Sequence, residues 1–216
     1  MNRAIASFVI GVLMASIALG NAAADTIKIV AFGDSGTQGS GRAHRSGQTG
    51  GVPRTEAWPA KLESALRAKG WDVSVANQGT AGQTARDAVS YVDMRVPTGT
   101  NLTIVWYGGN DIWAGRSQAD IAASLSEIVA KVRAKGSIVV LVTCSGDPAS
   151  SAVRQSADAS VCWTQGMRTP IPGGPLPQYD SGDGEHFNAA GNDAIVARAV
   201  PDIERLLMQH GFRPRQ

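Results

Sequence analysis

The sequence has few of the features that mark nucleic-acid-binding, metal-binding or membrane-spanning proteins. Its 216 residues carry a formal charge of +2, and the lysines and arginines form no run or stripe, so we expect no binding to nucleic acid. Two cysteines and three histidines stand without metal-ligand spacing, and we expect neither a metal nor an organic cofactor. Past the N-terminus no apolar stretch is long enough to span a membrane. No internal repeat or linker divides the chain.

Residues 1–24 have the composition of a secretory signal peptide. Arg3 gives a basic start, residues 4–19 are largely apolar, and three alanines that end at Ala24 fit the small-residue pattern of a cleavage site. An N-terminal membrane anchor is the alternative, but two serines and a glycine interrupt the apolar stretch. We therefore expect cleavage after Ala24 and a periplasmic or secreted protein with a single domain, residues 25–216.

Both cysteines, Cys144 and Cys162, lie in the expected mature chain. In an oxidising compartment such a pair can form a disulfide. The alternative is two buried thiols that pack as small apolar side chains. The choice depends on whether the two Cα atoms come within bonding distance.

Strand and helix patterns alternate along the chain. Apolar runs predict strands at residues 27–32, 71–75, 102–107 and 138–142, with a weaker candidate at 161–163. Helical spacing and caps predict helices at residues 55–70, 84–92 and 117–135, and a last one that follows Asn188. Residues 149–182, rich in Ser, Pro and Gly, show no helix pattern. This alternation predicts an α/β fold in which a mostly parallel sheet of four to five strands is covered by helices on both faces.

Polar residues follow successive predicted strands. Ser35 comes after the first strand, Gly79 after the second and Asn110 after the third, and residues 183–186 precede the last helix. Parallel strands bring such loops to one edge of the sheet. A hydroxyl, an imidazole, a carboxylate, an amide and glycine-rich turns are the groups that acyl transfer requires.

Each of these groups has a candidate role. We expect His186 to act as the base that activates Ser35. Asp183 lies three residues before His186, so its carboxylate can bind Nδ1 and fix the tautomer. The N–H groups of Ser35 and Gly79 and the side-chain amide of Asn110 are the candidate donors to an oxyanion.

Four short motifs resemble, in order, the four blocks of the GDSL/SGNH hydrolase family, and the resemblance covers almost the whole mature chain. The motifs are Gly33-Asp34-Ser35, Asn77-Gln78-Gly79, Gly108-Gly109-Asn110-Asp111 and Asp183-Gly184-Glu185-His186. The resemblance implies a flavodoxin-like three-layer α/β/α sandwich. It also implies the same roles for Ser35, Gly79, Asn110, His186 and Asp183 that their chemistry suggests. The exported single-domain form most resembles bacterial periplasmic lysophospholipases, thioesterases and arylesterases.

The resemblance implies a serine esterase that cleaves an ester or thioester through an acyl-enzyme. A short-chain or lipid ester is our first expectation and a carbohydrate O-acetyl ester the second. A non-catalytic glycan- or lipid-binding module is a further alternative, which the complete set of catalytic residue types disfavours. Tyr107 and Trp113 either line a substrate pocket or merely pack. Arg42, Arg45 and Arg54 either attract an anionic substrate or headgroup or lie on a solvated surface.

Overall fold

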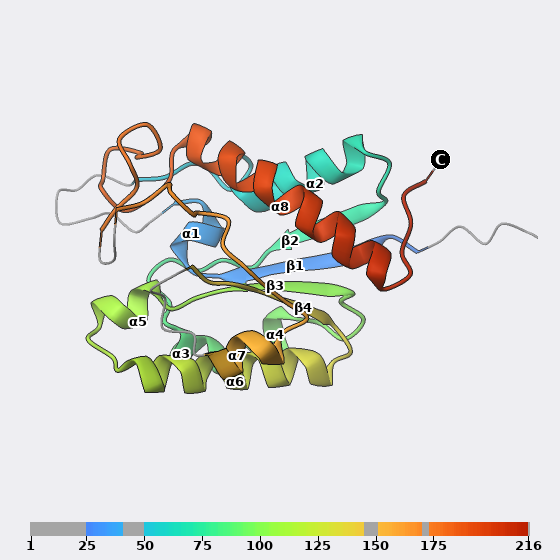
Figure 1. Ribbon diagram of the computed structural model, residues 1–216, viewed down its shortest axis with the longest axis horizontal. Helices are drawn as coiled ribbons and strands as arrows, with labels where there is room; N and C mark the ends of the chain where they lie inside the picture. Colours follow the sequence, from blue (N-terminus) through green and yellow to red (C-terminus); the bar gives the residue numbers. More distant parts are fainter. Residues whose placement is uncertain (1–24, 41–49, 145–150, 170–172, 216) are drawn as a thin grey trace, which may run out of the picture.

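The computed structural model describes residues 25–40, 50–144, 151–169 and 173–215. The expected signal peptide, Arg42 and Arg45 lie outside these described residues. Within them, five strands form one parallel sheet in the order β2-β1-β3-β4-β5 (Figure 1). The strands are β1 (Ile27–Gly33), β2 (Val73–Asn77), β3 (Leu102–Trp106), β4 (Ile138–Val142) and β5 (Ala159–Val161).

Helices cover both faces of this sheet. Helices α2 (Trp58–Ala68) and α8 (Ala189–Gln209) lie on one face (Figure 1). Helices α3 (Ala85–Val89), α4 (Val92–Arg95), α6 (Gln118–Ala134) and α7 (Ser151–Ser156) lie on the other. Two short helices, α1 (Ser35–Gln38) and α5 (Gly109–Trp113), stand at one end of the sheet. The expected three-layer α/β/α sandwich with a parallel sheet is confirmed.

The interior strand β1, which lies between β2 and β3, shows why the sheet needs two helix layers. Ile29 and Ala31 pack into the core under α2 and α8, whereas Val30 and Phe32 pack into the core under α3, α4 and α6. Successive side chains in a strand point to opposite faces, and here both faces are buried. This is why β1 reads in the sequence as an apolar run rather than as an alternation.

Three helix expectations differ from the structure in part or in full. Helix α2 begins at Trp58 with Ala57 as its N-cap residue and a proline in its first turn, so Thr55 is not the cap. The stretch expected as one helix from residue 84 is two short ones, α3 with a Thr84 capping box and α4. Helix α7 lies inside residues 149–182, where no helix pattern was found.

The last helix is a single one. Helix α8 starts after Asn188, whose side chain accepts a hydrogen bond from Gly191 N–H, and runs undivided through Pro201.

None of the helices in the described part of the chain combines the length and the apolarity needed to cross a bilayer. The sheet and its two helix layers therefore leave the loops at the carboxyl ends of the strands as the place where side chains of different segments meet.

Candidate active site

The carboxyl ends of the strands border one cavity of about 420 Å³. Ser35 is the first residue of α1, one residue past the end of β1. Asn110 lies in α5 after β3, and His186 precedes α8. All three line the cavity, together with Cys144 after β4 and Thr164 after β5. The expectation that these distant residues share one edge of the sheet agrees with this arrangement.

A sharp strand-to-helix corner presents Ser35. The Asp34 side chain caps α1 by accepting a hydrogen bond from Gly36 N–H at 3.0 Å. Gly33 is required at this corner, because a Cβ there would lie 2.1 Å from the Thr37 hydroxyl. Ser35 is only 7% exposed, and its own N–H donates no hydrogen bond to any described residue. The corner thus leaves the Ser35 hydroxyl and backbone N–H at the cavity.

His186 is held by Asp183. The imidazole Nδ1 lies 2.6 Å from Asp183 Oδ2, while Asp183 Oδ1 accepts the backbone N–H groups of Glu185 and His186 at 3.0 and 2.9 Å. Burial alone would raise the pKa of Asp183, but these hydrogen bonds outweigh it and lower that pKa to about 2. An ionised carboxylate only accepts, so Nδ1 carries the proton and Nε2 presents its lone pair. Within the described part of the chain, the buried Nε2 has no hydrogen-bond partner.

Gln83 joins the second and third loops of the site. Its backbone carbonyl accepts a hydrogen bond from Asn110 Nδ2 at 3.0 Å, and its side-chain Oε1 accepts one from the Tyr107 hydroxyl at 2.9 Å. Burial raises the pKa of Tyr107, so this hydroxyl stays a donor. The neighbouring Asp111, fully buried, accepts Ala85 N–H at 2.6 Å and ties α5 to the start of α3. One hydrogen of the Asn110 amide is used here and the other remains for a ligand.

The backbone N–H of Gly79, which we predicted as an oxyanion donor, already has a hydrogen-bond partner in this structure. This N–H donates to the Asn77 side chain at 3.0 Å. A Cβ at this position would lie 2.1 Å from Gln38 N, so the glycine allows the loop to pack against α1. Gly82 in the same loop is exposed to solvent and has a positive φ of 74°. Its N–H donates to none of the described residues.

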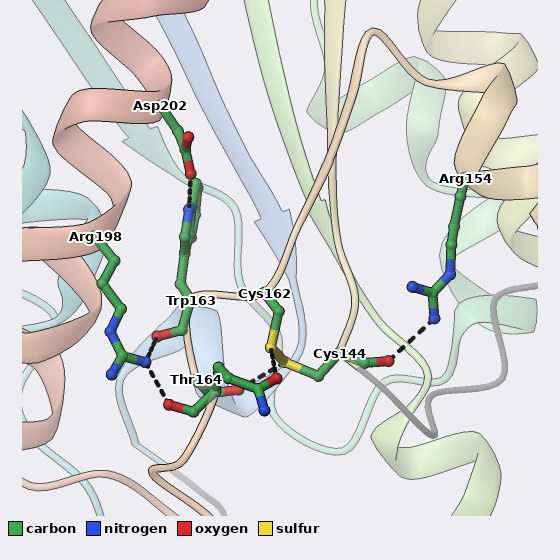
Figure 2. Close-up of a disulfide and its surroundings, with 8 residues drawn as sticks. Cys144, Arg154, Cys162, Trp163, Thr164, Arg198 and Asp202 are labelled. Carbon is green, nitrogen blue, oxygen red and sulfur yellow. Dashed lines mark hydrogen bonds between the residues drawn. A yellow bond between two sulfur atoms is a disulfide. The ribbon is translucent and has the colours of Figure 1, made fainter.

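A disulfide between Cys144 and Cys162 braces one wall of the cavity (Figure 2). It joins the ends of the neighbouring strands β4 and β5, with the two Cα atoms 4.6 Å apart. The next residue, Trp163, is buried, and its indole N–H donates to Asp202 of α8 at 3.1 Å. The hydroxyl of Thr164, which lines the cavity, lies 3.2 Å from the Cys144 sulfur. The pair is thus bridged here rather than present as two thiols.

The remaining predicted substrate contacts divide into two groups. Tyr107 and Trp113 both line the cavity, the first buried against Phe32 and the second 65% exposed at the surface. Arg54 instead donates to the carbonyl oxygens of Asn77 and Gly79, so it supports the second loop. Sequence reasoning missed Arg168 as a cavity residue, since no motif surrounds it.

Carboxyl groups outnumber cationic side chains around the cavity. Asp34, Glu185 and Arg168 line it, and Glu185 Oε1 lies 4.0 Å from Nε2 of His186. Burial raises the pKa of Asp34 to about 6, against the lowering effects of the hydrogen bond from Gly36 N–H and of the positive charge of Arg168. Within the residues that the structure describes, no group of three or more His, Cys, Asp or Glu side chains could hold a metal ion.

Comparison with known proteins gives matches along most of the chain. Residues 31–194 match the GDSL-like Lipase/Acylhydrolase family. Esterase TesA of Pseudomonas aeruginosa is 27% identical over 93 residues, which are 43% of this chain and 46% of that protein, so the match spans less than half of that relative.

Solved structures share the fold. A crystal structure of TesA superposes with a TM-score of 0.66 at 22% identity, covering 83% of this chain and 99% of that chain. The structure of Est24, a carbohydrate acetylesterase from Sinorhizobium meliloti, gives a TM-score of 0.65 at 16% identity and covers 83% and 99%. At these identities the likeness concerns the fold.

Proposed function

This chain belongs to the GDSL-like lipase/acylhydrolase family and is an ester hydrolase, and from that premise we propose that Ser35, His186 and Asp183 are its catalytic triad. Ser35 Oγ attacks the acyl carbon of the ester while His186 Nε2 takes the hydroxyl proton. When the tetrahedral intermediate collapses, the proton passes from Nε2 to the departing alkoxide, and the alcohol leaves. A water molecule, deprotonated by His186, then attacks the acyl-enzyme and releases the acid.

Three donors stabilise the oxyanion in this proposal: the N–H of Ser35, the free amide hydrogen of Asn110 and the N–H of Gly82, which replaces Gly79. Asn110 donates to the carbonyl oxygen of the residue after Gly82, which supports a common location of these two donors. Each such donor typically stabilises the transition state by about 2.7–4 kcal/mol. Asp183 stays ionised throughout and stabilises the imidazolium that forms.

One observation carries the proposal. The Nε2 atom of His186 is buried and has no partner among the described residues, although its ring is fixed through Nδ1 and it lies beside the cavity that contains Ser35. A buried polar atom without a partner costs about 1–3 kcal/mol, so such an atom calls for a functional explanation. A base that awaits the serine proton is that explanation.

The substrate that we propose first is a short-chain or lipid ester, with thioesters included in the same class of acyl donors. A carbohydrate O-acetyl ester is the second candidate, and it is supported by the polar side chains in a cavity wall that also contains aromatic ones. Thr164, Gln165 and Thr169 offer hydrogen bonds of the kind that sugar hydroxyls need. Competitive hydrolysis of p-nitrophenyl acetate, p-nitrophenyl octanoate and an acetylated sugar distinguishes these candidates.

The triad is tested by Ser35→Ala, with Ser64→Ala as a matched control, because Ser64 is exposed on α2 and bonds only within its helix. We expect Ser35→Ala to lower kcat for p-nitrophenyl acetate by at least ~10³-fold and to abolish labelling by an organophosphonate, while Ser64→Ala behaves as the parent. A Ser35→Ala variant as fast as its parent would contradict the proposal. Tight ligand binding by a parent that neither turns over nor becomes labelled would favour the non-catalytic module.

We also propose that residues 1–24 direct export and are removed after Ala24, leaving one domain in the periplasm or outside the cell. The Cys144–Cys162 disulfide supports this location, since such bonds persist in oxidising compartments. N-terminal sequencing of the protein from the periplasm or medium tests it: a mature chain that begins at Asp25 agrees, and a retained Met1 contradicts it.

A further inference from the structure

The Ser181 side chain links the acid of the triad to a segment far away in the chain. Its hydroxyl accepts a hydrogen bond from Gly51 N–H at 2.7 Å, across 130 residues of sequence. The same hydroxyl lies 3.0 Å from Asp183 Oδ1. Because the Gly51 N–H can only donate, the hydroxyl proton of Ser181 is directed to the Asp183 carboxylate.

The segment that Ser181 holds lies directly on this carboxylate. A Cβ added at Gly50 would lie 1.8 Å from Asp183 Oδ2, so only a glycine backbone fits there. The Asp183 side chain is accordingly 3% exposed. Residues 50–52, which we call the covering segment, therefore keep water from the oxygen that bonds to the His186 ring.

The covering segment is also attached to the helix of the nucleophile. Val52 N–H donates to Gly39 O at 2.7 Å, and Ser40 forms a β-bridge with Gly51. Gly39 N–H in turn donates to Ser35 O at 2.9 Å and closes α1. One series of hydrogen bonds thus leads from the helix that carries Ser35 to the side chain of Asp183.

Removal of the Ser181 hydroxyl would break this series at its last step. The Gly51 N–H would lose its partner, and Asp183 Oδ1 would keep only the two backbone donors of its own loop. A backbone N–H without a partner gains free energy by reaching water. The Gly51 backbone would therefore move toward solvent and take the covering segment off the carboxylate.

We propose that Ser181 is a positioning residue of the hydrolytic reaction, whose hydroxyl holds residues 50–52 over Asp183 and so keeps the carboxylate shielded and aimed at His186 Nδ1. This inference rests on the proposed roles of Asp183 and His186. A purely structural tie would behave differently: its loss would lower the melting temperature and leave kcat unchanged well below that temperature.

The test compares Ser181→Ala with Ser181→Thr, which keeps a hydroxyl, and with Ser64→Ala as the control. We expect Ser181→Ala to lower kcat on p-nitrophenyl acetate about tenfold with KM nearly unchanged, and to slow organophosphonate labelling of Ser35 in parallel. Ser181→Thr should recover most of the loss, and Ser64→Ala should match the parent. A parent-like kcat in a folded Ser181→Ala variant overturns the proposal.

A second readout does not depend on turnover. The Nδ1 proton shared by His186 and Asp183 should give a strongly deshielded proton resonance in the parent, and Ser181→Ala should shift or broaden it. An unchanged resonance overturns the proposal even if activity falls. If the proposed esterase activity is wrong, the parent will not hydrolyse the ester. The Nδ1 resonance will still show whether Ser181 positions Asp183.

Gly50→Ala provides an independent variant should Ser181→Ala not fold. Its methyl group would displace the Asp183 carboxylate from the other side, and we expect the same loss of kcat and the same change of the Nδ1 resonance. A folded Gly50→Ala enzyme with the kcat and the resonance of the parent would show that the covering segment does not position Asp183, and would overturn the proposal.

Discussion

Replacing Asp34 by Asn should stabilise the protein above pH 6. Burial raises the pKa of this carboxyl group from its ordinary value of 3.8 to about 6. The folded protein therefore disfavours the ionised form, although the Oδ1 atom is needed to accept Gly36 N–H and cap α1. Asn supplies the same acceptor oxygen without the charge, so the substitution removes the cost of ionisation and keeps the cap.

The magnitude follows from the shift in pKa. A rise of about two pKa units corresponds to about 3 kcal/mol, since one unit is worth about 1.36 kcal/mol. Between pH 3.8 and about pH 6 the unfolded chain has released this proton while the folded protein retains it. The contribution of Asp34 to the free energy of unfolding therefore falls as the pH rises through this window and stays at its lower value above it. The amide of the Asp34→Asn variant does not titrate. At pH 7 the free energy of unfolding of this variant should therefore exceed that of the parent by up to about 3 kcal/mol.

Urea unfolding of the parent and of Asp34→Asn between pH 4 and pH 8 measures this difference. The gap between the two free energies of unfolding should be small at pH 4 and widen toward pH 6.5. Asp34→Ala serves as the control, since it removes both the charge and the cap and should lie about 1 kcal/mol below Asp34→Asn at every pH. A gap between parent and Asp34→Asn that does not vary with pH would refute the reasoning from burial.

Three further predictions concern the cavity. Asn110→Ala should lower kcat on p-nitrophenyl acetate by about 10²–10³-fold in steady-state kinetics, because an oxyanion donor is lost; a loss confined to KM would contradict this. The double variant Cys144→Ala/Cys162→Ala should unfold in urea with a free energy lower by about 3 kcal/mol, because a loop of 18 residues is released, and an unchanged midpoint would contradict it. Glu185→Gln should raise kcat/KM for anionic relative to neutral esters severalfold, because a carboxylate 4.0 Å from Nε2 is removed, and an unaltered ratio would show that this charge does not reach the substrate.

The layers of this fold could be predicted because they follow from local patterns. Strands buried on both faces are continuous apolar runs, and the expected positions of β3 and β4 differ from the observed ones by no more than one residue. Helices α6 and α8 carry caps and an apolar face over several turns. The short helices α1, α5 and α7 have four to six residues, too few for a helical period to appear. The order of the strands in the sheet cannot be predicted from local patterns either, because it depends on which apolar runs pair with each other as strands.

The residues of the candidate site also divide into those that the sequence could predict and those that it could not. Ser35, Asn110 and His186 could be found because their chemistry is unusual and their motifs stand at strand ends. Gly79 was chosen by its place in a motif, but which N–H of a glycine-rich loop is available depends on the partner that each one finds. Here the Asn77 side chain, two residues earlier, takes the Gly79 N–H, and this local competition cannot be read from spacing.

The residues that position the reacting groups are the ones that the sequence conceals most completely. Gln83 joins the second and third loops through its backbone carbonyl and its side chain, and Ser181 joins the covering segment to Asp183. Neither residue belongs to an uncommon type, and their partners lie between 2 and 130 residues away. Their importance arises from the competition between donors and acceptors in a largely buried site, where each N–H or hydroxyl left without a partner costs free energy. Substitutions of Gln83 and Ser181 should therefore alter kcat, because they change the orientation of Asn110 and Asp183. The side chains of Gln83 and Ser181 take no part in the chemistry themselves.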